Sequence, residues 1–195
     1  LAQNPYIRMK NEKKEIPLPK DIFGTRLNSA GMDISEKQNL ENLSMKLEKF
    51  KNKRVNAESI YLGRQESSEK KIKVSSISSD IDMGTINYDA PKDIKDCLEK
   101  NDLDEWQNIS LKKRSEILNQ VADSIEKDPY ELIFYLINEA GKTIQNAVDE
   151  IREGVDFLRY YSEQALKIIE GRELDGPTGE ENKILYTPKG RFLCI

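Results

Sequence analysis

The sequence predicts an incomplete α/β fold, mostly helical, with short N-terminal strands and a C-terminal β-hairpin. Residues 91–168 carry apolar side chains at three- and four-residue spacing, which is the period of an amphipathic helix. Shorter β-prone stretches separated by turn residues lie on either side, at 55–89 and 184–195. A helical layer that leads into unfinished strands indicates part of an α/β domain.

Residues 1–54 are predicted to form a connector that contains one helix. In "EIPLPKDIFGTRLNSAGMDIS" two prolines flank a leucine and two glycines break the pattern, so this stretch is expected to be extended. The stretch 36–54 is predicted to be an amphipathic helix, because four apolar residues recur there at helical spacing: Leu40, Leu43, Leu47 and Phe50. Residues 55–195 form the second predicted unit.

Two groups of strands are predicted. Residues 55–89 hold three β-prone runs, "SIYLG", "IKVSSIS" and "MGTINYD", and the lysine-rich "SSEKKIK" between the first two is predicted to be a solvated hairpin loop. At the C-terminus the runs 184–187 and 191–195 flank "PKG", which is turn chemistry and predicts a hairpin.

Four helices are predicted between these strands. Pro91 fits the first turn of a helix that ends near Trp106. Gly141 is predicted to close the third helix, because a left-handed C-terminal cap is cheapest for glycine. Side chains suited to N-caps predict the starts of the second, third and fourth helices, and these are Ser110, Asp128 and Thr143.

Composition excludes several kinds of function. The formal net charge is −4, with lysine and glutamate interleaved, so no nucleic-acid partner is expected. The chain contains no histidine, which excludes Ser-His-Asp and Cys-His catalysis and His-ligated zinc within it. The two distant cysteines, with no signal peptide and no long apolar run, indicate a cytoplasmic location. The first residue is leucine and the last five are largely apolar, so both ends are expected to be cut.

Several motifs resemble a known family. "EAGKTIQNAVDEIREGVDFLRYY" resembles the segment of aldehyde dehydrogenases, and more narrowly of pyrroline-5-carboxylate dehydrogenase, that joins two long helices before the nucleotide-binding sheet. "GPTGEENKILYTPKGRFLCI" resembles the run that leads into Ser-Pro-Trp-Asn-Phe-Pro in that family. "IPLPKDIFGTRLNSAGMDIS" resembles the connector between the catalytic domains of proline utilisation A, the bifunctional proline dehydrogenase and pyrroline-5-carboxylate dehydrogenase.

The resemblance implies FAD-linked oxidation of proline, followed by NAD-linked oxidation of glutamate semialdehyde to glutamate. The second step needs a cysteine thiolate, an amide donor for the oxyanion, a carboxylate base and a nicotinamide. The resemblance places all of these beyond Ile195, so no catalytic, cofactor-binding or metal-binding residue is expected in this chain. NAD, FAD, the small-molecule substrate and peripheral membrane association are implied only for the full-length family. In these terms 1–54 is an inter-domain connector, and 55–195 is the N-terminal part of an aldehyde dehydrogenase-like NAD-binding domain.

Glu153 is the one candidate substrate-binding residue. By the match at "LRYY", the resemblance places it at the mouth of the substrate tunnel, where it would contact the substrate's ammonium group as a positioning charge. The alternative is a solvated glutamate on a helix face shared with Glu150 and Arg152.

Other reactive-looking residues are predicted to be structural. Cys194 lies in the apolar run "RFLCI" and is expected to be a small core residue, while Cys97 is either core or surface. Glu139 and Lys142 resemble a helix terminus more than an acid–base pair. Aromatic residues at helical spacing are expected to pack in the core, and these are Phe157, Tyr160 and Tyr161. "GPTGE" and "GRELDG" lack the context of a phosphate-binding loop.

Three functional hypotheses follow. The leading one is a fragment of a proline utilisation A protein that is inactive alone; a fragment of another aldehyde dehydrogenase is its variant. The second is an interaction module that self-associates, or pairs with a separately encoded remainder, through the strand edge at 183–195. The third is a free-standing helical scaffold unrelated to an enzyme, which would unfold cooperatively and expose no apolar surface.

Overall fold

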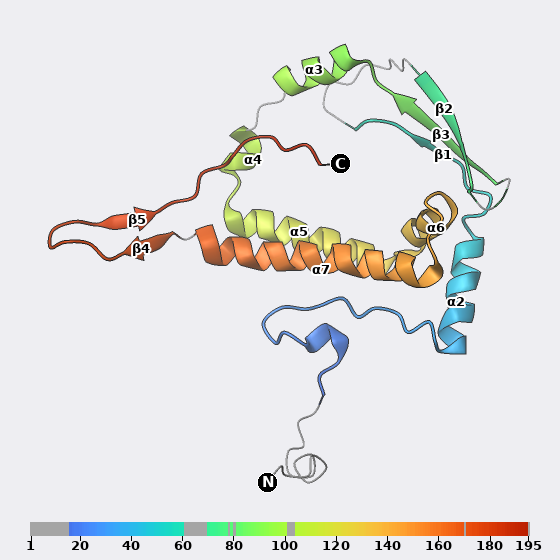
Figure 1. Cartoon of the computed structure of the whole chain (residues 1–195), viewed down its shortest axis with the longest axis horizontal. Coiled ribbons are helices and arrows are strands. Elements are labelled where there is room, and N and C mark those ends of the chain that lie inside the picture. Colours follow the sequence, from blue (N-terminus) through green and yellow to red (C-terminus); the bar gives the residue numbers. More distant parts are fainter. Residues whose placement is uncertain are drawn as a thin grey trace, which may run out of the picture.

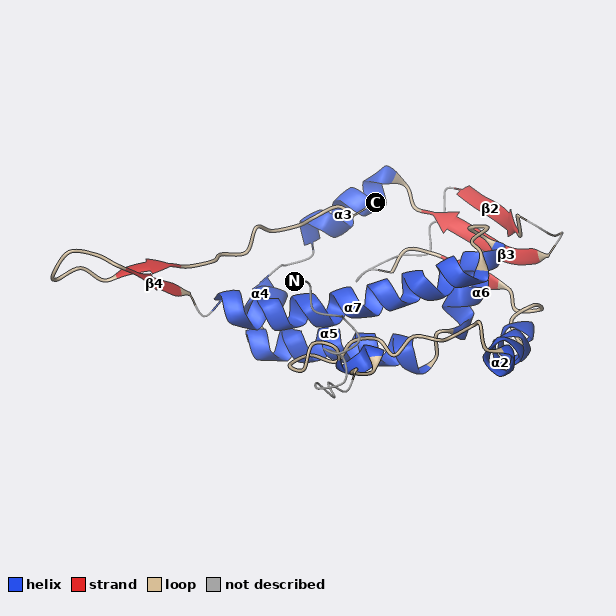
Figure 2. Ribbon diagram, turned by 60° about the horizontal axis from the view of Figure 1, so that its bottom comes forward, coloured by secondary structure: helices blue, strands red, loops and turns tan. Residues whose placement is uncertain are grey.

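The computed structural model describes residues 16–60, 70–77, 79, 81–100, 104–169 and 171–194. Two antiparallel helices, α5 (Leu111–Lys127) and α7 (Ile144–Ile169), lie side by side at its centre (Figure 1). The N-terminal connector runs along one side of this pair (Figure 2), and a small sheet and two short helices lie on the other side in Figure 1. The fold is thus a partial α/β domain, about half helical, as the sequence predicts.

The connector is extended, apart from one turn of 3-10 helix, η1 (Pro19–Asp21). It leads into α2 (Lys37–Glu48), which confirms the predicted amphipathic helix. The main core forms where α2 meets the other helices, and Leu43, Ile133, Ala147 and Val148 are buried together there. Met32 and Ile34 of the connector pack against this cluster, so the connector is part of the folded unit.

Helix boundaries largely follow the predicted caps. The Ser110 hydroxyl accepts a hydrogen bond from the Lys113 N–H at 3.2 Å, and the Thr143 hydroxyl accepts one from the Asn146 N–H at 3.2 Å. Gly141 adopts φ +69° and ends α6 (Tyr130–Asn138), as predicted. Asp128 does not cap α6: it ends α5, and Pro129 takes the N-cap position without a side-chain cap. The predicted helix from Pro91 to Trp106 is assigned as two elements, α3 (Pro91–Lys100) and α4 (Asp104–Asn108).

The N-terminal sheet has three strands in the order β1–β3–β2. β1 (Val55–Ala57) pairs in parallel with β3 (Asp82–Tyr88), and β2 (Lys70–Ser75) pairs antiparallel with β3. The third predicted strand is confirmed, and the second is confirmed with earlier bounds. The first was placed too late, since Ser59 and Ile60 are outside any strand, and the rest of "SIYLG" lies outside the described residues. The hairpin-loop interpretation of "SSEKKIK" is wrong for 70–73, which belong to β2.

The C-terminal hairpin exists, but not at the predicted strands. β4 (Arg172–Leu174) pairs antiparallel with β5 (Asn182–Ile184), and the hairpin extends away from the end of α7 (Figures 1 and 2). The turn is therefore formed by residues 175–181, which contain "DGPTG", and not by "PKG". Residues 185–194 are not assigned to a strand and run back past α4 in Figure 1. No helix in the described part of the chain has the length and apolar character needed to cross a membrane.

Candidate functional site

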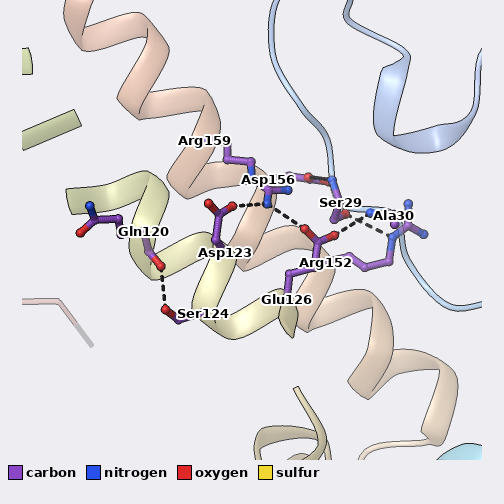
Figure 3. Close-up of polar contacts among 9 residues, drawn as sticks. All are labelled: Ser29, Ala30, Gln120, Asp123, Ser124, Glu126, Arg152, Asp156 and Arg159. Carbon is purple, nitrogen blue, oxygen red and sulfur yellow. Dashed lines mark hydrogen bonds and ion pairs between the residues drawn. The ribbon is translucent and has the colours of Figure 1, made fainter. Parts of the chain in front are cut away.

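The most highly organised polar site joins the connector to α7. Ser29 is 1% exposed, and its backbone N–H and hydroxyl donate to the two carboxylate oxygens of Asp156 at 2.6 and 3.0 Å. Arg152, one turn earlier on α7, donates from Nε to the Ser29 hydroxyl at 3.4 Å. Figure 3 shows these side chains converging on the connector from one face of α7. A single serine is thus held by groups of opposite charge.

The next connector residue is held by α5. The Ala30 N–H donates to Glu126 Oε1 at 2.7 Å, and the other oxygen of Glu126 accepts from Arg159 Nη2 at 2.7 Å. The same nitrogen of Arg159 also donates to Asp123 at 2.7 Å. We call Glu126, Arg152, Asp156 and Arg159 the connector clamp, because together they bind two successive connector residues (Figure 3).

Arg159 is the electrostatic centre of the connector clamp. It is only 6% exposed, although a guanidinium is rarely buried without partners. Burial alone would lower the pKa of Arg159, but hydrogen bonds to Asp123 and Glu126 raise that pKa above its usual value. The residue is therefore permanently charged and bridges α7 to α5.

Further polar contacts continue along the same seam. The Ser115 and Ser162 hydroxyls lie 2.6 Å apart in the buried interface of α5 and α7. Nearer the N-terminus, the Arg26 guanidinium stacks on the rings of Phe23 and Tyr160, 4.4 and 5.1 Å from their centroids. Arg26 also contacts Glu163 at 3.4 Å. The connector is consequently fastened along much of α7.

A cavity of about 240 Å³ lies beneath the docked connector. Residues 29–32 of the connector form one wall, and Ile133, Val148 and Val155 form much of the apolar remainder. Glu126 and Arg152 of the connector clamp also line it. A second, more polar cavity of about 340 Å³ lies further along the seam, between Arg26, Asp123 and Arg159.

Glu153 lies on α7 between two residues of this seam, but its side chain is exposed. Within the described residues it takes part in no hydrogen bond or ion pair, so it is available to a partner outside them. The structure does not bring it together with another predicted site residue. Its assignment as a substrate contact stays a prediction.

The other candidates are distributed as follows. Lys142 forms an ion pair with Glu150, and Glu139 is exposed, which fits a helix terminus better than an acid–base pair. Cys97 is half-buried, whereas Cys194 is exposed and outside any strand, so its predicted role as a core residue is wrong. Cys194 lacks a partner strand in the described structure, which explains its exposure.

The predicted aromatic core residues are also largely exposed. Phe157, Tyr160 and Tyr161 are 49%, 40% and 59% exposed, and the rings of Phe157 and Tyr161 stack on each other at 5.8 Å. They form a surface strip on α7, so the prediction that they pack in the core is wrong. Helical spacing identified their shared face correctly but could not show what covers it.

Sequence reasoning missed the connector clamp. One signal was present: Arg159 follows Val155 by four residues and precedes Ser162 by three, so it falls on the buried stripe of α7. An arginine on an apolar stripe requires a buried acidic partner. Ser29 gave no comparable signal, because its partner Asp156 lies 127 residues further along the chain.

Neither of the two cavities of the site is lined by a cysteine. The described residues contain no group of three or more acidic, cysteine or histidine side chains that could hold a metal ion. They also lack the glycine-rich strand-to-helix turn that NAD phosphates require, since β3 is followed by Asp89 and Ala90 before α3. The expectation that this chain alone binds no NAD stays a prediction.

Comparison with known proteins identifies the family. The aldehyde dehydrogenase family profile matches residues 64–195, which is more than half of the chain. The chain belongs to the aldehyde dehydrogenase family. The matched region contains α5, α6 and α7, the helices that form most of the site described above.

Two curated relatives belong to the proline-catabolic branch of that family. 1-Pyrroline-5-carboxylate dehydrogenase 1 of Halalkalibacterium halodurans is 35% identical over 90 residues, which cover 46% of this chain and 18% of that protein. The bifunctional protein PutA of Salmonella typhimurium is 31% identical over 201 aligned positions, which cover 93% of this chain and 13% of that protein. The chain thus spans less than a fifth of the length of either relative.

A solved structure shares the fold. Pyrroline-5-carboxylate dehydrogenase from Thermus, determined with bound NAD, superimposes with a TM-score of 0.68 at 19% sequence identity. The match covers 80% of this chain and 31% of the Thermus chain. The partial α/β architecture is therefore that of an aldehyde dehydrogenase domain, and a solved structure with this fold holds NAD.

Proposed function

We propose that this chain is the inter-domain connector and the N-terminal part of the pyrroline-5-carboxylate dehydrogenase domain of a proline utilisation A protein. The observation that carries the proposal is the extent of similarity. Alignment with PutA covers 93% of the chain, whereas alignment with the separate dehydrogenase covers 46%. The contacts of residues 26–32 with α5 and α7 support the proposal, because a segment that joins two domains is expected to bind to the surface of one of them. We also propose that the connector ends at residue 54 and that the dehydrogenase domain begins at residue 55.

The whole protein would oxidise proline with FAD and then glutamate semialdehyde to glutamate with NAD. In that reaction the residues of this chain would position the substrate and would not take part in making or breaking bonds. Glu153, exposed on α7, would attract the ammonium group of the substrate and orient the aldehyde. The connector clamp would hold α7 in place, since it grips the helix on either side of Glu153.

The chain alone is proposed to be inactive. Cys97 lies on α3 and the exposed Cys194 lies outside any strand, so neither belongs to the connector clamp, and the resemblance to the family places its nucleophile beyond Ile195. The purified chain should produce no NADH, measured by absorbance, when incubated with NAD and pyrroline-5-carboxylate. A complete aldehyde dehydrogenase of the same branch serves as the positive control. NADH formation that disappears in Cys97→Ser or Cys194→Ser variants would contradict the proposal.

A second candidate is a complementing subunit. It is favoured by residues 185–194, which are extended and outside any sheet, with Leu185, Phe192 and Leu193 72%, 78% and 85% exposed. Such a segment could add a strand to a separately encoded remainder, or to a second copy. Co-expression with the rest of a related enzyme should then give co-purification and NADH formation. Deletion of 185–195 is the matched control and should abolish both, and failure of the intact pair to co-purify would exclude this candidate.

The helical-scaffold hypothesis has less support. It expects no exposed apolar surface, whereas Phe157, Phe192 and Leu193 are among many large apolar side chains that are about half or more exposed. Membership of an enzyme family also argues against a scaffold without enzymatic relatives.

A further inference from the structure

We propose that the cavity beneath the connector is a binding site for a small organic carboxylate with an apolar body. Its volume, about 240 Å³, is slightly below the roughly 300–1,000 Å³ of most ligand pockets, so it would take a small molecule. The cavity differs from the exposed position of Glu153, and the proposal is independent of the proposed enzymatic function.

The inner wall of the cavity is apolar and therefore favours a ligand with a hydrocarbon group. Ile133, Val148 and Val155 line it and are 1%, 4% and 1% exposed, which places them in the dry interior of the fold. Met32 and Tyr130 also line the cavity. A hydrocarbon group that fills the cavity leaves water and gains free energy in proportion to the apolar area buried.

Arg152 supplies the partner for a carboxylate. Its Nε is used by the Ser29 hydroxyl, and Nη1 forms a long ion pair with Asp149 at 3.9 Å. Within the described residues, neither terminal nitrogen of Arg152 donates a hydrogen bond. A guanidinium whose terminal nitrogens are held only by one long ion pair can present both of them to the two oxygens of a carboxylate.

Gly31 keeps this guanidinium at the cavity wall. It adopts φ +72°, and a Cβ built there would lie 2.7 Å from Arg152 Nε. The side chain of Arg152 therefore lies directly on the connector backbone, in space that any other residue would fill. The arginine is positioned before a ligand arrives.

The second charged group of the cavity does not oppose an anion strongly. Glu126 accepts from the Ala30 N–H at one oxygen and from Arg159 at the other, both at 2.7 Å. Both oxygens of Glu126 are therefore occupied by donors, whereas the terminal nitrogens of Arg152 have only the long ion pair with Asp149. The cavity consequently favours a carboxylate over an amine.

Ligand binding should be coupled to docking of the connector. Because residues 29–32 form one wall, the complete cavity exists only when the connector is docked. A ligand that binds only the docked form shifts the equilibrium toward it by mass action. The backbone amides of Ser29 and Ala30, which bond to Asp156 and Glu126, report this directly.

The test uses the full 195-residue chain, with benzoate as the probe and benzamide as its uncharged counterpart. We expect benzoate to bind saturably with a Kd on the order of 1 mM. Benzamide should bind about tenfold more weakly, because it lacks the charge-assisted pair with Arg152. Benzoate should also slow hydrogen exchange at Ser29 and Ala30. Absence of saturation, or equal binding of the two probes, would overturn the proposal.

Two variants test whether Arg152 supplies the positive charge that binds the carboxylate. Arg152→Gln should weaken benzoate binding about tenfold, whereas Lys127→Gln, which removes an exposed charge on α5 outside the cavity, should change it less than about twofold. The unmodified chain provides a measurement that does not depend on variant folding. Nuclear Overhauser contacts should join the benzoate ring to methyl groups of Ile133, Val148 and Val155. Unchanged binding by Arg152→Gln, or contacts to other methyl groups, would refute the site.

Discussion

At the scale of single residues, Arg159 is the most buried side chain of the connector clamp. Its Nη2 bridges Asp123 and Glu126, and Glu126 in turn holds Ala30. Removing one partner from a buried ion pair leaves the others desolvated without compensation. Here Asp123 is 67% exposed at its side chain, so water can recover part of the loss.

We expect Arg159→Met, which keeps an unbranched aliphatic side chain, to lower the free energy of unfolding by about 2 kcal/mol. Lys167→Met is the matched control, because it removes an exposed ion pair with Glu163 on the same helix. Its cost should stay below about 0.5 kcal/mol. Urea denaturation of the three proteins measures both values. A cost for Arg159→Met no larger than that of the control would show that the buried bridge contributes no net stability.

Asp156 controls docking of the connector more than folding of the helices. Both oxygens accept from Ser29, at 2.6 and 3.0 Å, and an amide in place of the carboxylate can keep only one of these bonds. We expect Asp156→Asn to accelerate hydrogen exchange of the Ser29 and Ala30 amides about tenfold and to leave the middle of α7 unchanged.

The control for this variant is Glu150→Gln, on another face of α7. Glu150 forms a half-exposed ion pair with Lys142 and has no contact with the connector among the described interactions. Its exchange pattern at Ser29 should equal that of the unmodified chain. Equal exchange in both variants would mean that Asp156 does not hold the connector.

At the scale of elements, two glycines should respond in opposite directions. Gly84 on β3 pairs with Val55 at φ +126°, and a Cβ at Gly84 would overlap the backbone of Val55. Gly84→Ala should therefore separate β1 from β3 and cost about 2 kcal/mol or more. Gly154 lies inside α7 with open space around its Cβ position. Gly154→Ala should stabilise the chain by about 0.5–1 kcal/mol.

Thermal and urea unfolding compare the two glycine variants in one experiment. A stable Gly84→Ala protein with an intact β1 would show that the three-residue parallel pairing can shift without cost. Destabilisation by Gly154→Ala would point to a close neighbour of α7 outside the described residues.

Helices could be predicted from this sequence because their signals are local. Ser110, Gly141 and Thr143 act on residues no more than five positions away, and the structure confirms all three. Strands depend on distant partners, and here the sequence was less informative. β1 is three residues long and pairs with a strand 29 positions away, as in Val55 with Gly84. Within 70–75, lysine alternates with isoleucine and valine, which is a pattern typical of a strand. The high lysine content of this stretch instead led to the prediction of a solvated loop.

The C-terminal hairpin shows a different limit. Two turn sequences compete there, "DGPTG" at 175–179 and "PKG" at 188–190. Turn chemistry alone does not decide which one brings two strands together, because the strands must also find a matching register. The polar run Arg172–Leu174 pairs, whereas the more apolar 191–194 is unpaired within the described residues.

The candidate site was predictable only where the resemblance supplied it. Glu153 came from alignment with a family motif, and no local property of an exposed helical glutamate marks it. The connector clamp depends on Ser29 meeting Asp156 and on Ala30 meeting Glu126, across 127 and 96 positions of sequence. Such pairings follow from the tertiary arrangement of the connector against α5 and α7, which periodicity does not contain.

At the scale of the whole molecule, three carboxyl groups should make stability depend on acid pH. Hydrogen bonds from the hydroxyl and the backbone N–H of Ser35 lower the pKa of Asp33 below 3.8, and the Lys167 ammonium lowers the pKa of Glu163 below 4.5. Burial tends to raise the pKa of Asp82, but the Gly84 N–H, Lys73 and Arg54 together lower it below 3.8. All three groups therefore bind protons less readily when the chain is folded than when it is unfolded.

The sign of the effect follows from linkage. When the pH falls below 4.5, the unfolded chain takes up protons before the folded chain does, so the free energy of unfolding decreases. The contribution of these groups is complete above 4.5 and is lost as the pH falls through their lowered pKa values. The urea midpoint should be nearly constant from about pH 6 to 8 and should decline steadily below about pH 4.

Glu163→Gln tests one of these groups, because glutamine resembles the protonated acid. The variant should be less stable than the unmodified chain at pH 7, and the difference should shrink in acid, as the pH falls through the lowered pKa of Glu163. Glu173→Gln, on the exposed strand β4, is the matched control. A difference between Glu163→Gln and the unmodified chain that stays the same at neutral and acid pH would show that this group acts through its shape and not its charge. Because Glu163 contacts both Arg26 of the connector and Lys167 of α7, its protonation should also loosen the connector before the helices unfold.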